Sequence, residues 1–345
     1  GLYKNFIEPG QDLQPRKPGI MIRAGIVGGA GYTAGELIRL ILHHPALKLD
    51  FVFSTSNAGN EIAQVHADLE GEELPRFTSE LNLEVDVLFL CLGHGNSKTF
   101  LENHSFSEAT HIIDLSNDFR LNEDRVLGDM EFVYGLPELN ASEISKSKYL
   151  ANPGCFATAI ELALLPLASQ GLLQDDVHVN AVTGATGAGV SLSKTTHFTW
   201  RDNNFSHYKA FTHQHLGEIT ESVSQVQPDW NREIYFLPNR GNFSRGIFAT
   251  AYTEFTQDLE AAFELYEGFY KHAPFTFVSR REVFLKQVVN TNKCLIHLHK
   301  HKNKLLITSV IDNLLKGASG QAIENMNLMF GLERKLGLEL KANFF

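Results

Sequence analysis

The sequence predicts an α/β protein in which a Rossmann-type parallel sheet is followed by a second, α+β domain. Three observations support this fold class. A glycine-rich turn joins a strand to a helix near residue 30, strand-like runs alternate with helical segments as far as residue 153, and amphipathic strand-like runs follow. The 345 residues are enough for two domains, each with its own hydrophobic core.

The first domain is expected over residues 21–153. Residues 22–27 have the pattern of a strand and residues 28–31 that of a glycine-rich turn. Apolar residues then recur at helical spacing until Pro45 ends the helix. Further strands are expected at residues 49–54, 85–92 and 112–115. Strands that alternate with helices in this way indicate a parallel sheet.

The second domain is expected over residues 154–312, with strands at residues 177–183, 234–237, 246–255, 283–289, 293–299 and 305–311. A last helix opens at residues 317–320 and ends at Gly331, and its apolar residues share one face. We expect this helix to return to the first domain, so that residues 313–345 belong with residues 21–153. Residues 1–20 carry no long apolar stretch and are interpreted as an N-terminal extension.

The composition excludes several classes of function. The net charge of −10 comes without a basic block, which argues against nucleic acid and anionic membrane surfaces as partners. No run of 18 apolar residues is present, so no membrane span is expected. The three cysteines, Cys91, Cys155 and Cys294, do not form the pattern of a disulfide framework, and a cytoplasmic location is expected.

Cys155 is the most informative residue of the chain. It follows the turn made by Pro153 and Gly154 and directly precedes a helical stretch over residues 156–168. Free amide groups and the positive end of the helix dipole favour a thiolate there, so we expect a pKa of ~7 and a nucleophilic sulfur. The alternative is a buried structural cysteine.

The turn at residues 28–35 is a candidate nucleotide site. Small residues let the backbone approach a pyrophosphate, and the N-terminus of the following helix supplies amide donors. The spacing departs from the strict dinucleotide fingerprint, so a tight turn without a ligand is the alternative. The residues expected at the cofactor are Gly28, Ala30, Gly31, Tyr32 and Thr33.

The residues after the second strand indicate which nucleotide is bound. They are Ser54-Thr55-Ser56-Asn57, with no acid among them. A carboxylate would hold a ribose hydroxyl but repel a 2′-phosphate, to which a hydroxyl group can donate. Ser54 and Ser56 therefore favour NADP(H), unless they only solvate a loop. Gly93 ends the third strand, at the edge where such sheets bind nucleotides.

His215 is the candidate acid/base residue. Glu218 follows it by three positions, and on a helix the two side chains are neighbours. A carboxylate beside an imidazole orients it and stabilises its protonated form, so His215 could take a proton from Cys155 and return one. His213 is the rival candidate, and two surface histidines with a helix-capping glutamate are the alternative.

Two arginines are candidate substrate-binding residues, because the guanidinium fork suits carboxylates and phosphates. They are Arg240 and Arg245, and an ordinary surface position is the alternative for each. His297, His299 and His301 alternate along one strand-like run, where we expect a solvated strand edge and no metal site.

Together these motifs resemble N-acetyl-gamma-glutamyl-phosphate reductase, the acyl-phosphate reductase family of arginine biosynthesis. The resemblance covers nearly all of the chain from Met21, in residues 28–37, 114–120, 134–138, 152–158, 183–191, 213–219, 245–247 and 317–331. It implies a Rossmann-type NADP domain and a catalytic and dimerisation domain like that of aspartate-semialdehyde dehydrogenase. It also implies a homodimer or homotetramer.

The resemblance implies roles for single residues. Cys155 would be the nucleophile and His215 the acid/base residue, oriented by Glu218. Arg245 and Asn152 would bind substrate. The residues implied at the nicotinamide end of the cofactor site are Gly184, Ala188, Gly189 and, from the last helix, Asn325.

The implied reaction is the NADPH-dependent reduction of N-acetyl-gamma-glutamyl phosphate to N-acetylglutamate 5-semialdehyde through a thioester on Cys155. Residues 239–243 depart from the more apolar run usual in the family, so Arg240 could meet the extra carboxylate of an N-succinyl substrate. Three rivals stay open. They are another acyl-phosphate reductase such as aspartate-semialdehyde dehydrogenase, a catalytically silent NADP-binding sensor, and a cysteine hydrolase.

Overall fold

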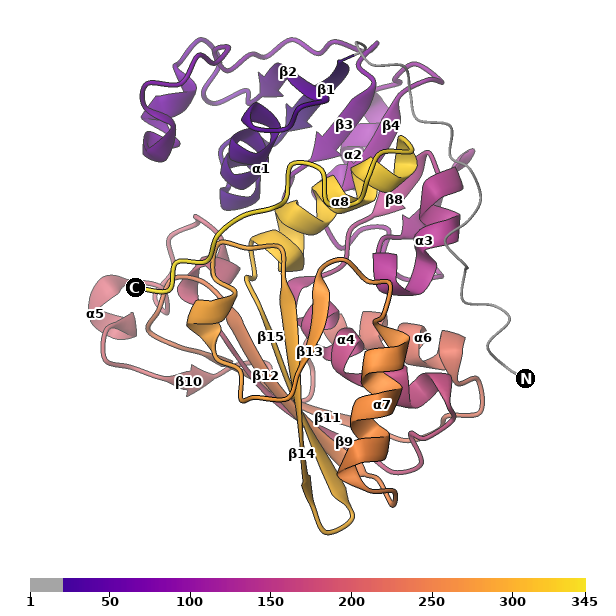
Figure 1. The fold of residues 1–345 in the computed structure, drawn as a ribbon. Coiled ribbons are helices and arrows are strands. Elements are labelled where there is room, and N and C mark those ends of the chain that lie inside the picture. Colours follow the sequence, from indigo (N-terminus) through magenta and orange to yellow (C-terminus); the bar gives the residue numbers. More distant parts are fainter. Residues whose placement is uncertain (1–20) are drawn as a thin grey trace.

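The structure is a computed structural model that describes residues 21–345, so the expected N-terminal extension lies outside the described residues. Figure 1 shows two sheets one above the other, with the C-terminal helix α8 (Gly320–Met329) near their junction. The upper sheet is parallel and the lower sheet is mixed. This architecture confirms the fold class expected from the sequence.

The upper sheet has six strands, all parallel to their neighbours. Their order is β2 (Leu47–Phe53), β1 (Ile22–Val27), β3 (Val87–Leu90), β4 (His111–Asp114), β8 (Tyr149–Ala151) and β7 (Val133–Tyr134). The strands are strongly apolar because both faces are covered. Helices α1 (Tyr32–Leu42), α3 (Pro137–Lys146) and α8 contribute to the hydrophobic cluster on one face, and α2 (Asn96–Asn103) to the cluster on the other.

The strand order reverses at β1, which has β2 on one side and β3 on the other. In parallel sheets of this kind, ligands bind beyond the carboxyl ends of the strands at such a reversal. The glycine-rich turn follows β1 at this point, so the fold places it where a nucleotide is expected.

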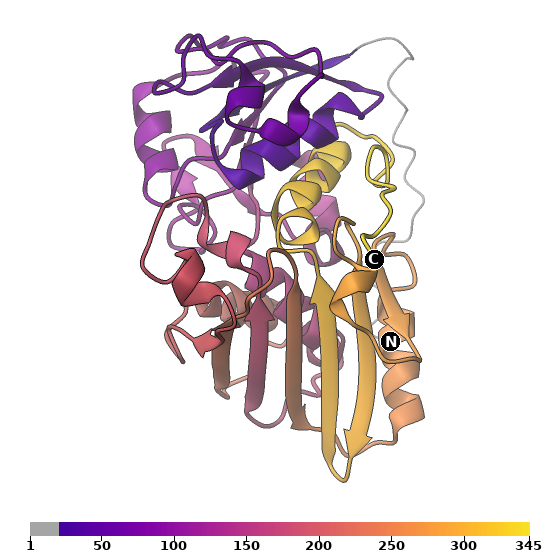
Figure 2. The same cartoon turned by 90° about the vertical axis from the view of Figure 1, so that its left-hand side faces the viewer.

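The lower sheet has seven strands, in the order β10 (Ser206–His207), β11 (Ile234–Arg240), β9 (Val177–Thr183), β12 (Ile247–Glu254), β15 (Lys304–Ile311), β14 (Cys294–His301) and β13 (Thr276–Ser279). Buried and accessible residues alternate along β9 and β12, because one face packs against helices. These helices are α4 (Cys155–Ser169), α6 (His215–Val226) and α7 (Leu259–Phe269). Figure 2 views the opposite face, which these helices do not cover.

Shorter elements complete the described chain. They are the 3-10 helices η2 (Ile62–Gln64), η3 (Ala67–Leu69), η4 (Ala185–Ala188) and η5 (Leu285–Gln287), the hairpin of β5 (Val126–Leu127) and β6 (Met130–Glu131), and helix α5 (Phe198–Arg201).

One expected strand is wrong. Residues 283–289 contain η5 instead, and the edge position beside β14 is taken by β13, which the sequence analysis did not expect. The apolar residues Val283 and Val288 are buried because they pack on Val310 of β15. The run therefore covers part of the second face of the lower sheet and does not extend that sheet.

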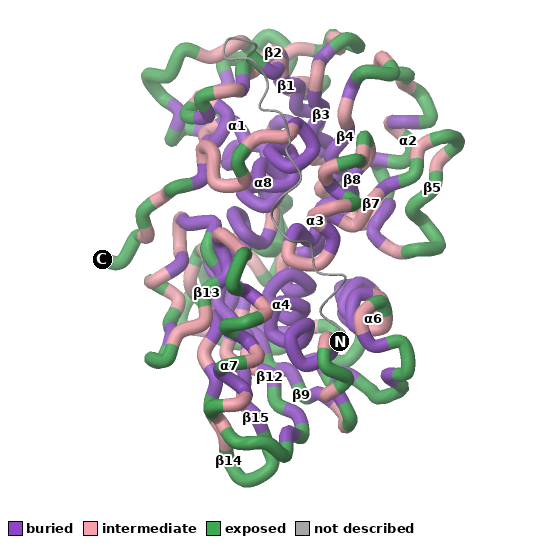
Figure 3. The backbone as a smooth tube through the Cα atoms, turned by 45° about the vertical axis from the view of Figure 1, so that its right-hand side comes forward, coloured by how far each residue is buried: buried purple, intermediate pink, exposed green. Residues whose placement is uncertain are grey.

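The C-terminal helix returns to the first domain, as expected. It is preceded by a π-helical turn, η6 (Leu315–Ser319), and Ile323 and Met326 share a hydrophobic cluster with Ile26 and Ile38 of the upper sheet and its helix. Every residue of α8 is buried, as Figure 3 shows. Within residues 21–345, no helix combines the length and the apolar character needed to cross a membrane.

Candidate active site

Cys155 is the first residue of α4, and it lines a cavity of about 690 Å³ whose other lining residues come from both domains. Gly154 precedes it with extended backbone, and no side chain caps the helix N-terminus. The turn also contacts the C-terminal segment. A Cβ on Gly317 would lie 2.9 Å from the Cβ of Cys155, and the Asn152 side chain donates to the carbonyl of Ala318 at 2.9 Å.

His215 is the first residue of α6 and lines the same cavity. A Cβ built on Gly154 would lie only 2.3 Å from His215 Nε2. The imidazole therefore lies directly against the turn that presents the thiol. The structure brings Cys155 and His215 together, as the sequence predicts.

The predicted lowering of the Cys155 pKa is wrong for the resting site. Burial raises the pKa of this thiol above its ordinary value, and the Phe156 amide and Arg120 oppose that rise without cancelling it. The helix N-terminus acts in the expected direction, but loss of water is the larger effect. The thiol is protonated at rest, so a neighbouring base has to remove its proton.

His215 has the protonation state that such a base requires. Its side chain is buried, and burial together with Arg120 holds the pKa of His215 well below the ordinary range. Its Nδ1 has no hydrogen-bond partner within the described chain. A neutral imidazole that lies against the Cys155 turn has the protonation state of a general base.

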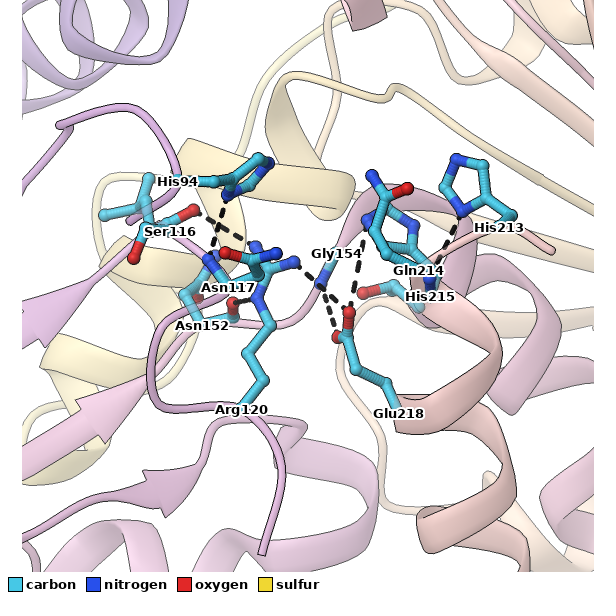
Figure 4. A network of polar contacts seen from close by, with 12 residues as sticks. His94, Ser116, Asn117, Arg120, Asn152, Gly154, His213, Gln214, His215 and Glu218 are labelled. Carbon is cyan, nitrogen blue, oxygen red and sulfur yellow. Dashed lines mark hydrogen bonds and ion pairs between the residues drawn. The ribbon is translucent and has the colours of Figure 1, made fainter. Parts of the chain in front are cut away.

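Glu218 contacts the turn before the nucleophile more closely than it contacts His215. The distance from Glu218 Oε2 to His215 Nε2 is 4.0 Å, too long for a hydrogen bond. Glu218 accepts hydrogen bonds from the Gly154 amide at 2.8 Å and from Arg120 at 3.2 Å (Figure 4). It also accepts one from the Tyr134 hydroxyl at 2.9 Å. The expectation that Glu218 keeps His215 protonated is wrong, because burial dominates the imidazole.

Arg120 and Tyr134 are functional candidates that the sequence analysis did not single out. Arg120 is buried and donates to the carbonyl of Asn152 at 2.9 Å and to that of Leu115 at 3.1 Å, besides its contact with Glu218. It therefore fixes the start of the Cys155 turn. The signal was present, because both residues lie in motifs on which the family resemblance rests, residues 114–120 and 134–138.

His213 has different contacts from His215. Its Nδ1 accepts a hydrogen bond from the His215 amide at 3.2 Å, which satisfies a donor at the start of α6. Its ring packs edge-on against Phe156 and Phe236, and burial lowers the pKa of His213 to about 4. His213 lines the cavity, and its Nδ1 is already engaged by a backbone amide at the start of α6.

The two candidate arginines lie in different surroundings. Arg240 lines the cavity and lies over the Tyr208 ring at 4.6 Å, and its Nη1 has no hydrogen-bond partner within residues 21–345. Arg245 does not line the cavity. It forms ion pairs with Glu36 of α1 at 2.7 Å and Asp312 at 3.0 Å, which connect the two domains. This geometry gives no support to substrate binding by Arg245, whereas Asn152 does line the cavity.

The turn after β1 fits a nucleotide phosphate. The space where Gly31 would carry a Cβ is empty to 4 Å, and the N-terminus of α1 has no side-chain cap. Gly31 lines the cavity, so the amides of the first turn of α1 can reach a ligand there. Gly28 has a φ of +82°, and a Cβ on it would lie 2.6 Å from the Cys91 carbonyl, so close strand packing accounts for this glycine.

The other predicted cofactor residues divide into two groups. Tyr32, Thr33, Gly93, Ala188 and Gly189 line the cavity. Outside that lining lie Gly28, Ala30, Ser54, Ser56, Gly184 and Asn325. Asn57 donates to the hydroxyls of Ser54 at 3.0 Å and Ser56 at 3.2 Å, at the carboxyl end of β2.

Gly184 and Asn325 have structural contacts. A Cβ on Gly184 would lie 2.5 Å from the Ser244 carbonyl, so this glycine permits close backbone packing. Asn325 is fully buried and donates to the Gly135 carbonyl at 2.8 Å and to Asn152 at 3.1 Å. Its contact with the cavity therefore runs through Asn152. Within the described chain, no group of three or more histidine, cysteine or acidic side chains has the arrangement of a metal site.

Two family models divide the chain between them. The semialdehyde dehydrogenase NAD binding domain matches residues 23–147, and the semialdehyde dehydrogenase dimerisation domain matches residues 155–313. The chain therefore has the two domains of the semialdehyde dehydrogenase class.

Curated relatives narrow this class. The chain is 66% identical to the N-acetyl-gamma-glutamyl-phosphate reductase of Christiangramia forsetii and 60% identical to that of Flavobacterium johnsoniae, each over 325 residues. Both alignments cover 94% of this chain and 100% of the relative. The chain belongs to the N-acetyl-gamma-glutamyl-phosphate reductase family, which confirms the resemblance found in the sequence.

Solved structures share the fold at low identity. The chain is similar to aspartate semialdehyde dehydrogenase II of Vibrio cholerae complexed with ASA, with a TM-score of 0.68, 14% identity, and coverage of 90% of this chain and 98% of that one. The aspartate semialdehyde dehydrogenase of Candida albicans with NADP gives a TM-score of 0.65 at 14% identity, with the same coverage. At such identity the likeness concerns the fold alone.

Proposed function

We propose that this protein catalyses the NADPH-dependent reduction of N-acetyl-gamma-glutamyl phosphate to N-acetylglutamate 5-semialdehyde, with release of phosphate, in arginine biosynthesis. The observation that carries this proposal is the single cavity lined by Cys155, His215 and the Gly31 end of the nucleotide turn. A cysteine hydrolase would need Cys155 and His215 but no nucleotide turn. An NADP-binding sensor would need the nucleotide turn but neither Cys155 nor His215. The full-length relatives named for this activity support the choice of substrate.

The residues of the cavity suggest how the acyl group is transferred. His215 takes the proton of the Cys155 thiol, and the resulting thiolate attacks the carbonyl carbon of the acyl phosphate. A carbon–sulfur bond forms, the carbon–oxygen bond to phosphate breaks, and phosphate leaves with the electron pair. The thioester on Cys155 is electrophilic enough for reduction. The departing phosphate takes its proton from solvent, and His215 returns the proton of Cys155 to the sulfur when the aldehyde is released.

The cofactor would bind across the carboxyl ends of β1, β2 and β3. NADPH, when bound, supplies the hydride that reduces the acyl group. The amides at Gly31, Tyr32 and Thr33 would hold the pyrophosphate, and the Ser54 and Ser56 hydroxyls would face the 2′-phosphate. The residues proposed to enclose the nicotinamide end are Gly93, Ala188 and Gly189, which line the cavity beside Cys155.

An N-succinyl substrate is a second candidate, favoured by one observation. Arg240 lines the cavity, and its Nη1 is buried without a hydrogen-bond partner in the described chain. An unsatisfied guanidinium nitrogen suits a second carboxylate, which a succinyl group has and an acetyl group lacks. Turnover of N-acetyl and N-succinyl glutamyl phosphate should be compared, and a clear preference for the acetyl substrate would end this idea.

The proposed assembly is a homodimer or homotetramer in the cytoplasm. The matched dimerisation domain supports an oligomer, and the open face of the lower sheet offers a surface. There His178 is stacked between Tyr235 and Tyr252, with ring centroids 5.2 and 5.0 Å apart, and both tyrosines are exposed. Three free cysteines suit a reducing compartment. Analytical ultracentrifugation of Tyr252→Asp should give a smaller species than the wild type, and equal masses would move the interface elsewhere.

The reverse reaction is the most direct test of the function. It measures phosphate-dependent reduction of NADP by N-acetylglutamate semialdehyde and avoids the unstable acyl phosphate. Cys155→Ser should bind NADPH as the wild type does and lose nearly all turnover, because the hydroxyl is a far weaker nucleophile. Wild-type-like turnover in this variant would remove Cys155 from the mechanism, and absence of NADPH binding to the wild type would favour a hydrolase.

A further inference from the structure

Two buried carboxylates meet at one tyrosine hydroxyl behind the Cys155 turn. The oxygen of Tyr134 lies 2.9 and 3.1 Å from the two carboxylate oxygens of Glu161 and 2.9 Å from Glu218 Oε1. Glu161 belongs to α4, the helix that starts at Cys155, and it is completely buried. Ser222 of α6 donates to Glu161 Oε1 at 2.8 Å.

The number of protons at this junction is too small for two anions. A tyrosine hydroxyl has one proton and can donate to one carboxylate only. If it donates to Glu218, the contact between the Tyr134 oxygen and Glu161 has no proton between two electronegative atoms. If the hydroxyl donates to Glu161 instead, the contact between the Tyr134 oxygen and Glu218 lacks a proton. One further proton must therefore reside on one of the two carboxyl groups.

The surroundings place that proton on Glu161. Glu218 has the charge-assisted contact with Arg120 at 3.2 Å and the Gly154 amide at 2.8 Å, both of which favour its anion. Glu161 has no ion pair with any residue in the described chain, and its remaining donor is the neutral Ser222 hydroxyl. A neutral carboxylic acid can donate to the Tyr134 oxygen, and Tyr134 can then donate to Glu218.

The electrostatics of the pocket agree with this proton count. Burial, reinforced by the neighbouring Glu218, raises the pKa of Glu161 well above its ordinary value, against opposing contributions from Ser222, Tyr134 and Arg120. Tyr270 approaches Glu161 from the other side, and Glu161 contributes to raising the pKa of Tyr270. The Tyr270 hydroxyl donates to the Leu162 carbonyl, so it does not supply a hydrogen bond to Glu161.

We propose that Glu161 is a positioning residue that stays protonated during turnover and, through Tyr134, holds Glu218 against the amide of Gly154, next to the nucleophile. The bonds run from the Glu161 carboxyl to the Tyr134 oxygen, and from the Tyr134 hydroxyl to Glu218 Oε1. The cluster then has one anion for the one guanidinium of Arg120. An ionised Glu161 would add a negative charge on the helix of Cys155 and oppose the thiolate. The inference rests on the proposed function only in taking Cys155 as the nucleophile.

The test is the pH dependence of Cys155 alkylation by iodoacetamide, followed by peptide mass spectrometry so that Cys91 and Cys294 are scored separately. Glu161→Gln keeps a donor of the same shape, so its midpoint pH should equal that of the wild type. Tyr134→Phe removes the bridge and leaves the Glu218 charge with one donor fewer. The pH midpoint of Cys155 alkylation in Tyr134→Phe should therefore rise by roughly one pH unit.

Tyr266→Phe is the matched control. Its hydroxyl is also buried and donates to α4, at the Ala163 carbonyl at 2.5 Å, but it does not touch a carboxylate. This variant should lower the thermal midpoint and leave the alkylation midpoint unchanged. If Tyr134 has only a structural role, Tyr134→Phe should also lower the thermal midpoint and leave the alkylation midpoint unchanged. That result would overturn the proposal.

Infrared difference spectroscopy gives a readout that needs neither substrate nor a reactive cysteine. At about pH 8, the wild type should show the carbonyl band of a protonated carboxylic acid that is missing in Glu161→Gln. Absence of that band, or an alkylation midpoint in Glu161→Gln as displaced as in Tyr134→Phe, would refute the protonated Glu161. Failure of the proposed reaction in activity assays would leave both readouts standing, so the two failures are distinguishable.

Discussion

Gly154→Ala should inactivate the enzyme by displacing His215 and not by straining the backbone. Gly154 has φ −67° and ψ 152°, a conformation that alanine adopts freely. The added methyl group would lie 2.3, 2.5 and 2.6 Å from the Nε2, Cε1 and Cδ2 atoms of the His215 ring. These distances are far inside van der Waals contact, so the imidazole has to move.

The ring has little room to move. His215 is 6% exposed, and the centroid of the His213 ring lies 4.6 Å from its own. Overpacking of this kind costs about 1–3 kcal/mol of folding free energy. The larger effect should fall on catalysis, because a well-placed general base contributes roughly 10²–10⁴-fold to the rate. We expect a loss of kcat in that range, with binding of NADPH little changed.

The assay is NADPH oxidation with acyl phosphate, or the reverse reaction, together with thermal unfolding. Gly268→Ala is the control, because the space around a Cβ there is open within 4 Å and the residue lies inside α7. It should keep full activity and gain up to about 1 kcal/mol of stability. The double variant Gly154→Ala/His215→Ala should be no slower than His215→Ala alone. Turnover of Gly154→Ala within twofold of the wild type would refute the reasoning.

Further predictions concern the arginines and His213. Arg245→Met leaves the buried Asp312 without a guanidinium, whereas Glu36 keeps its ion pair with Arg39, and should cost roughly 3 kcal/mol in denaturant unfolding. A raised KM at unchanged stability would instead restore Arg245 as a substrate ligand. Arg240→Met should raise KM with little change in stability, because Arg240 forms no ion pair in the described chain, and an unchanged KM would remove it from the substrate site. For His213, burial lowers the folded-state pKa from 6.5 to about 4, so the unfolded chain binds the extra proton between these values and stability is lost as the pH falls. His213→Gln should flatten this part of the stability curve measured by urea unfolding, and a curve as steep as that of the wild type would contradict the assignment.

The fold was predictable because its signals are local. The glycine turn follows a strand, the Pro-Gly turn precedes Cys155, and the strand at residues 177–183 alternates as a half-covered sheet requires. The strand predicted at residues 283–289 is wrong, since an apolar run has the same composition whether it forms a strand or packs over one. The spacing of apolar residues indicates which side chains are buried, but it does not identify the element against which they pack.

The site was predictable in its members but less so in its electrostatics. The motif spacing identified Cys155 and His215, and the structure brings both to one cavity. The pKa shifts of both groups depend on how much water the tertiary fold removes, which no sequence pattern states. The partners of Arg245 were hidden for a similar reason, because Glu36 and Asp312 are distant in sequence and meet only when the domains pack together.

The contact of Gly317 with Cys155 has a consequence for the order of events during synthesis. The wall behind the thiol is built from η6, which lies near the end of the chain, and Ala318 also anchors Asn152. During translation Cys155 leaves the ribosome before residues 315–319 have been synthesised. Domains generally fold in the order in which they emerge, so the Cys155 turn is present before η6 can pack against it. The surroundings of Cys155 should therefore be complete only after residues 315–329 have been synthesised and α8 has packed against the first domain.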